Sequence, residues 1–119
     1  MPALVPLDPT SPEDIERMWD LMTHHHVPTG EYTQVQFWLA CPDHATGEFL
    51  AQYLAHSADF TAAVPCPRVS EDGREYWDLA VTSYGAGLSL AFLRQVCGTV
   101  RVASARFGCR VYAWERAAA

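Results

Sequence analysis

The sequence contains no lysine and no asparagine, so its eight basic residues are all arginine and are outnumbered by 14 acidic residues. The resulting formal net charge of −6 argues against sequence-independent binding of nucleic acid, because such binding rests on neutralising phosphates. The charge is also uneven. Residues 1–60 carry nine acids and one arginine, whereas residues 61–119 carry five acids and seven arginines. An acidic first half suits a protein partner with a basic surface.

Long apolar runs are missing as well. No stretch approaches the ~18 residues that a membrane span requires. The first residues lack the cationic segment and the apolar segment of a secretory signal. We therefore expect a cytoplasmic protein that does not associate with membranes. The four cysteines form no Cys-x-x-Cys pair, which predicts free, partly buried thiols.

Catalytic motifs are absent too. The chain has neither a nucleophile elbow nor a His-Glu-x-x-His motif. The segment 83–87, SYGAG, could present N–H groups to an anion, but it is neither a P-loop nor a complete dinucleotide fingerprint. We interpret it as a flexible connection between a strand and a helix. The sequence therefore predicts a protein that is not an enzyme and that carries no cofactor.

The 119 residues that are present are half hydrophobic, which is enough for one domain with a packed core. A leader helix is expected over residues 11–26, because Ser11 can cap it, Pro12 suits its first turn, and acids follow. Its apolar stripe consists of Ile15, Met18, Trp19 and Met22.

A strand and a second helix come next. Apolar and polar residues alternate from Tyr32 to Cys41, which predicts a strand that Pro42 ends. Asp43 is a good cap for a helix that ends near residue 57. The buried stripe expected for this helix is Phe49, Leu50, Tyr53 and Leu54.

The second half of the chain repeats this order. The Glu71–Arg74 segment contains Asp-Gly and predicts a turn. A long helix should begin near residue 88, and Gly98 leaves two alternatives for its end. Either the helix stops at Gly98 and residues 99–102 form a strand, or, as we expect, it runs through Gly98 and stops at Gly108. The remaining strands are expected over residues 59–64, 75–82 and 110–115.

The leader helix is thus followed by β-α-β-β-α-β, which predicts an α+β protein with a ferredoxin-like split βαβ fold. Its four-stranded antiparallel sheet should have the first and third strands in the centre and both later helices on one face. We expect residues 1–10 to form a loose arm, residues 11–116 to form a single domain, and residues 117–119 to form a tail.

This pattern resembles the family of the regulator of ribonuclease E activity B (RraB). The resemblance covers roughly residues 12–116. It consists of an acidic leader helix, a strand that opens with Tyr32-Thr33 and leads to the capped helix at Asp43, and a long helix that closes on Gly108. An aromatic last strand, Tyr112-Ala113-Trp114-Glu115, completes it. The resemblance implies a non-enzymatic regulator that binds another protein, such as a ribonuclease, and it implies no particular site residue.

The sheet face opposite the two later helices is the first candidate site. Aromatic sheet faces stack bases in RNA-recognition domains, but Asp78 and Glu115 would lie near this one, so we do not expect nucleic acid. The alternatives are that the leader helix covers the face, that a second copy binds it, or that a foreign protein does. The residues expected to line it are Gln34, Gln36, Trp38, Tyr76, Tyr112 and Trp114.

A small-molecule or metal-binding domain of the same fold is the second hypothesis. Imidazole and thiolate are zinc ligands, and the candidates are His24 and His26 in a run of three histidines, and Cys41 and His44 in a Cys-x-x-His half-site. No second half-site follows at the usual spacing. Consecutive helical histidines also project about 100° apart, so the run fits a polar helix end equally well.

Overall fold

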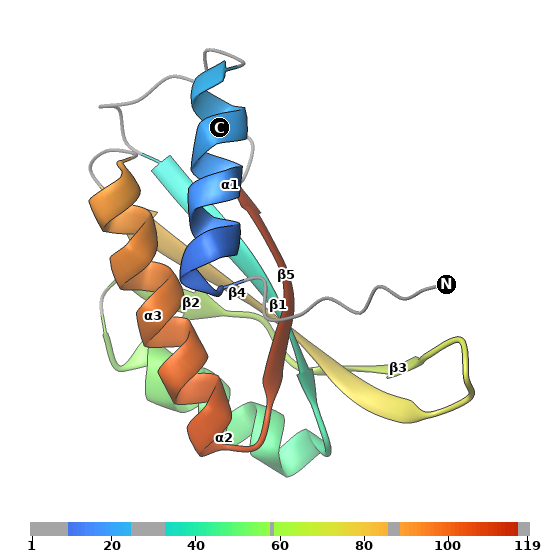
Figure 1. The fold of residues 1–119 in the computed structure, drawn as a ribbon. Helices are drawn as coiled ribbons and strands as arrows, with labels where there is room; N and C mark the ends of the chain where they lie inside the picture. Colours follow the sequence, from blue (N-terminus) through green and yellow to red (C-terminus); the bar gives the residue numbers. More distant parts are fainter. Residues whose placement is uncertain (1–9, 25–32, 58, 86–88, 117–119) are drawn as a thin grey trace.

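The computed structural model describes residues 10–24, 33–57, 59–85 and 89–116 (Figure 1). Tyr32, the histidines at 25 and 26, residues 86–88 of the expected connection, and the expected tail lie outside the described residues. Of the expected N-terminal arm only Thr10 is described, and it is buried.

The fold is α+β, with an N-terminal helix followed by β-α-β-β-β-α-β. The strands form one antiparallel sheet in the order β2-β4-β1-β5, with β3 also pairing with β4. The order places β1 and β4 in the centre, as the ferredoxin-like prediction required. The elements are α1 (Pro12–His24), β1 (Thr33–Cys41), α2 (His44–Ala55), β2 (Phe60–Ala62), β3 (Cys66–Val69), β4 (Glu75–Gly85), α3 (Leu90–Arg106) and β5 (Arg110–Arg116).

The prediction of four strands was wrong, because β3 is a fifth. It was missed because prolines at 65 and 67 indicate the end of a strand. Here Pro65 lies between β2 and β3, and Pro67 lies within β3, because an edge position tolerates a residue without an N–H group. β2 and β3 share the same edge of β4, with Phe60 opposite Ser83 and Val69 opposite Glu75. The expected Asp-Gly turn joins β3 to β4, and Gly73 adopts a φ of 86° there. Figure 1 shows this hairpin projecting away from the helices.

Side-chain caps fix the helix starts. The backbone N–H of Asp14 donates to Ser11 Oγ at 3.3 Å, and that of Thr46 donates to Asp43 Oδ1 at 2.7 Å. Both caps were predicted. The cap of α3 was not predicted. Ser89 provides it by accepting a hydrogen bond from the N–H of Phe92 at 3.0 Å. Ser83, expected to open a flexible connection, is instead a buried residue of β4 whose hydroxyl donates to the Val35 carbonyl at 3.3 Å.

The end of α3 confirms the expectation about the two glycines. The helix passes through Gly98 and ends in a turn in which Gly108 adopts a φ of 69°. The N–H of Cys109 donates to the Ser104 carbonyl at 2.8 Å, and that of Gly108 donates to the Ala105 carbonyl at 3.1 Å. This pair of bonds is a Schellman motif, whose left-handed residue favours glycine.

The core lies between one face of the sheet and the three helices. Leu50 and Leu54 of α2, and Leu93 and Val100 of α3, are buried with Ile15 of α1. The core-facing residues of the strands are Val35, Phe37, Leu39, Leu79, Val81 and Val111. α1 lies beside α3 (Figure 1), and the Arg94 guanidinium forms an ion pair with Glu16 between them.

Candidate functional site

The sheet face turned away from the helices, called the open face below, carries most of the predicted site residues. Gln34, Gln36 and Trp38 are half-buried and alternate along β1 with fully buried core residues. Tyr76 of β4 and Tyr112 of β5 lie on the same side and are also half-buried. All three helices pack on the opposite face, so within the described chain no helix lies over this side of the sheet.

Trp38 stands at the centre of the open face between two small neighbours. The register sets it opposite Ala80 of β4 on one side and Ala113 of β5 on the other. Neighbouring side chains on one sheet face determine how much of a large ring they shield. Because an alanine methyl reaches only a short way above the sheet, neither of these two neighbours can cover the indole, which is partly exposed.

A polar and aromatic cluster lies beside Trp38. The Tyr112 hydroxyl donates to Asp78 Oδ1 at 2.7 Å, and Arg68 Nε lies 3.6 Å from Asp78 Oδ2. Burial, followed by the hydrogen bond and the charge of Asp78, raises the pKa of Tyr112 well above its usual range. The rings of Tyr76 and Tyr112 meet edge to face, with centroids 6.4 Å apart. The cluster therefore combines aromatic surface with a carboxylate whose charge is partly balanced.

The placement of Trp114 on this face was wrong. Its side chain is only 6% exposed and lies in the core, with its ring centroid 6.4 Å from that of Phe37. The cause is a β-bulge. Trp38 pairs with Ala113 and Leu39 pairs with Val111, which leaves Tyr112 as the extra residue of β5. One extra residue reverses the alternation beyond it, so Tyr112 and Trp114 point to opposite faces.

The suggestion that the leader helix covers the open face is also contradicted. Ile15 is buried in the core, and Met18 and Trp19 pack against it from the helical side. The apolar stripe of α1 was therefore identified correctly, but its target is the flank of α3 and the core-facing side of the sheet.

The predicted metal ligands do not come together in the described part of the chain. His44 Nε2 lies 3.2 Å from Glu48 Oε1, and the rings of His44 and Trp77 meet edge to face. Cys41 is buried at the end of β1, His24 ends α1, and His26 lies outside the described residues. No group of three or more His, Cys, Asp or Glu side chains in the described ranges is arranged to hold a metal ion.

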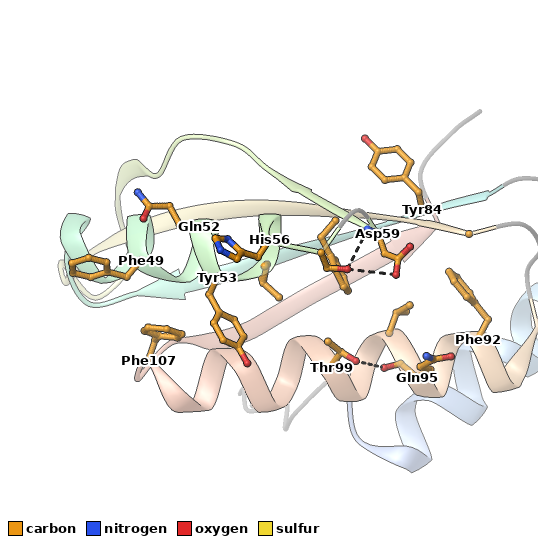
Figure 2. Close-up of a pocket in the computed structure, with 15 residues that line it drawn as sticks. Phe49, Gln52, Tyr53, His56, Asp59, Tyr84, Phe92, Gln95, Thr99 and Phe107 are labelled. Atoms are coloured by element: carbon orange, nitrogen blue, oxygen red, sulfur yellow. Dashed lines mark hydrogen bonds between the residues drawn. The ribbon is translucent and has the colours of Figure 1, made fainter.

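A second candidate site, which the sequence did not predict, is a groove between α2 and α3 (Figure 2). This α2–α3 groove has a volume of about 910 Å³. Because of this groove, only half of the stripe predicted to be buried on α2 is in fact buried. Leu50 and Leu54 are buried as expected, but Phe49 and Tyr53 are 60% and 47% exposed. The exposure of two aromatic residues on a stripe that should be covered is the signal of the groove, and it becomes visible only once the helices are placed.

The groove has an apolar floor and a polar mouth. Phe60 and Val96 are buried at its base, and Phe92 lies against Gly85, where no side chain could fit without displacing the ring. At one end Tyr53 of α2 meets Phe107 edge to face, with centroids 5.6 Å apart. Figure 2 shows Tyr53 pointing toward α3, whereas Tyr84 points away from the groove. The polar lining residues are Gln52, His56, Ser57, Asp59, Gln95 and Thr99.

Comparison of the chain with models of known protein families and with curated protein sequences finds no match. None of the described helices combines the length and the apolar composition that crossing a bilayer requires.

Proposed function

We propose that the chain is a non-catalytic regulatory protein of the RraB type, which acts in the cytoplasm by binding another protein through its open face. The observation that carries the proposal is the central tryptophan. Trp38 stands partly exposed between two alanines on a face that no described helix covers. Tryptophan and tyrosine are the residues that most often dominate the energy of protein interfaces.

The composition of the open face supports a protein partner. Interface centres are rich in aromatic residues and poor in charge, with polar groups at the rim. Here Trp38 has the Tyr76 and Tyr112 rings to one side, while Gln34 and Gln36 follow along β1 toward the other end of the strand. The acidic first half of the chain suits a partner with a basic surface. The RraB resemblance gives a ribonuclease as the first partner to test, and a second copy of the chain as the alternative.

The test compares two variants, one at a partly exposed position and one at an exposed position. Trp38→Ala removes the central ring of the open face, and Val102→Ala changes an exposed residue of α3 on the helical side. We expect the wild type and Val102→Ala to bind purified ribonuclease E from the same organism equally. Trp38→Ala should bind at least about 30-fold more weakly, which corresponds to ~2 kcal/mol for a central aromatic residue. Biolayer interferometry measures this affinity.

Sedimentation velocity of the chain alone provides the second arm of this test. A dimer that Trp38→Ala dissociates and Val102→Ala preserves would assign the open face to self-association. A monomer that binds no ribonuclease, or binding that is equal in all three proteins, would refute the proposal.

We propose as a second function that the α2–α3 groove binds a small apolar molecule. Its volume of about 910 Å³ lies within the range of ligand pockets, which are mostly apolar with a few polar groups that orient the ligand. The exposed rings of Phe49 and Tyr53 give the wall an aromatic character. His56 and Asp59 at the mouth could hydrogen-bond a polar head group.

A filling variant tests this second function without changing the core. Thr99→Phe places a ring in the groove from an exposed position of α3, and Val102→Phe is its control on the same helix outside the groove. The probe is anilinonaphthalene sulfonate, whose fluorescence rises in apolar pockets. We expect Thr99→Phe to abolish saturable fluorescence and Val102→Phe to preserve it. Fluorescence that does not saturate, or that both variants retain, would contradict a site in the groove.

A further inference from the structure

Two cysteines far apart in the sequence meet at one end of the sheet. Cys41 is the last residue of β1, and Cys109 directly precedes β5. These strands are antiparallel, with Ala40 opposite Arg110, so the next rung sets Cys41 against Cys109. Opposed residues of antiparallel strands have Cα atoms about 4.5–5.5 Å apart. Disulfides form at Cα separations of about 4.4–6.8 Å, so the backbone already satisfies this requirement.

The two side chains also lie on the same face of the sheet. Both are on its core side and buried, with Cys41 1% exposed and Cys109 7% exposed. The Cys109 thiol also lies 3.7 Å from the Phe107 carbonyl, to which it donates. Both cysteines are free in this structure, so the pair is in its reduced form.

The other two cysteines are placed differently. Cys66 is exposed in β3, and the register sets it opposite Asp78. Cys97 is buried within α3. Neither is opposed by a cysteine across a strand pair, so the arrangement of Cys41 and Cys109 is particular to these two residues among the four.

We propose that Cys41 and Cys109 form a redox-active pair, a modification site that closes to a reversible disulfide when the protein meets hydrogen peroxide. The proposal is independent of the function proposed above, because it concerns the core side of the sheet and not the open face.

The reaction balances with peroxide as the only oxidant. The Cys109 thiolate attacks one peroxide oxygen, the O–O bond breaks, and hydroxide leaves, which gives a sulfenic acid at Cys109. The Cys41 sulfur then gives up its proton and attacks the Cys109 sulfur, and the S–O bond breaks with release of water. In total two thiols and one peroxide give one disulfide and two water molecules. Sulfur is oxidised and peroxide oxygen is reduced.

The surroundings of the two cysteines indicate which one attacks the peroxide and which one then closes the disulfide. The hydrogen bond from Cys41 lowers the pKa of Cys109, because it stabilises the thiolate. The same hydrogen bond, with burial and the nearby carboxylates, raises the pKa of Cys41. Cys109 is also the more exposed of the two. It is therefore the first sulfur that an entering peroxide meets, and Cys41 is the resolving thiol.

The disulfide would link the start of α2 covalently to the end of α3. Cys41 leads directly into Pro42 and Asp43, which begin α2, and Cys109 takes part in the Schellman turn that ends α3. The first turn of α2 lies over the Cys41 sulfur, since a side chain at Gly47 would come within 3.5 Å of it. A disulfide between residues so distant in sequence restricts the unfolded chain strongly. We expect the oxidised protein to be the more stable form.

The experiment uses the full chain with Cys66→Ser, which removes the exposed thiol and leaves the core unchanged. The protein is treated with hydrogen peroxide in its native state and mapped by mass spectrometry after alkylation. We expect two thiols to disappear together, one peptide pair linked through Cys41 and Cys109, and a melting temperature raised by about 5 °C or more. Dithiothreitol should reverse both changes. Cys97 should be alkylated only after unfolding.

A second variant separates the two steps. In the same background, Cys41→Ser keeps a hydrogen-bond donor beside Cys109 but cannot form a disulfide, so the reaction should stop at a sulfenic acid on Cys109, which dimedone traps. The proposal is overturned if both thiols remain reduced until the protein unfolds. It is also overturned if Cys109 proceeds to sulfinic acid in the presence of Cys41, or if the linked peptides contain Cys97.

Discussion

The opposite orientation of the two tryptophans gives the sharpest test of the fold. Trp114→Ala would empty a site in the core beside Phe37, because the indole is only 6% exposed. A fully buried tryptophan covers about 150–250 Å². At about 25 cal/mol per Å² its loss amounts to about 4–6 kcal/mol, and measured truncations of large core residues cost about 3–5 kcal/mol. We expect the free energy of unfolding to fall by about 3–5 kcal/mol.

Trp38→Ala should cost much less. Its ring lies on the open face between two alanines and remains partly exposed in the native state. Its loss removes contacts on the sheet surface and creates no enclosed cavity. We expect a decrease of about 1–2 kcal/mol, which is typical of partly exposed substitutions.

Urea unfolding followed by far-UV circular dichroism measures both values. Trp114→Phe is the matched control, because it keeps a ring against Phe37 and should recover most of the lost stability. If Trp38→Ala destabilises the protein as much as Trp114→Ala, then the bulge at Tyr112 is absent. The alternation of β5 would then continue unbroken to Trp114.

Two further predictions concern helix ends and interiors. Gly98→Ala should stabilise the protein by about 1 kcal/mol, since Gly98 lies inside α3 with open space around it. Gly108→Ala should destabilise the protein by about 1 kcal/mol, since the φ of 69° at Gly108 disfavours a side chain. Urea unfolding of both variants measures these changes in the free energy of unfolding. If both variants are stabilised, or both destabilised, the prediction is contradicted. Asp43→Ala should lower the melting temperature at neutral pH, because the hydrogen bond from the Thr46 N–H lowers the pKa of Asp43 and stabilises its ionised form. That stabilisation is complete above about pH 5 and is lost as the pH falls through the native pKa, so calorimetry should show the melting curves of variant and wild type converging below about pH 4. A difference that stays constant with pH would exclude the charged cap.

Local signals were enough to predict the order of the elements. Ser11 and Asp43 cap helices where they were expected to, and Gly108 ends α3. Each of these features depends on the residue and its near neighbours, so the sequence reports it directly. The alternation along β1 correctly separated the core residues from those of the open face, because a central strand packed on one side has a strict period of two.

The features that were missed depend on contacts between distant segments. The bulge at Tyr112 is defined only by the pairing of β5 with β1, so nothing within β5 reveals that Trp114 changes face. The apolar stripe of α1 shows that this helix is covered, but it does not show by what. The exposure of Phe49 and Tyr53 follows from the hollow between α2 and α3, which is a property of two helices and not of either alone. The meeting of Cys41 and Cys109 likewise depends on the register.

The geometry of the open face bears on the class of partner. Base stacking on a sheet requires several rings that lie flat and accessible. Tyr76 and Tyr112 instead meet at an interplanar angle of 83°, and the Tyr112 hydroxyl is held by Asp78. One of these rings must present its edge, and a carboxylate lies beside it, which disfavours an approaching phosphate. Trp38 is left as a single ring with short neighbours, an arrangement that an apolar side chain of another protein can surround. This geometry supports the proposal of a protein partner rather than RNA for a reason that goes beyond the net charge of the chain.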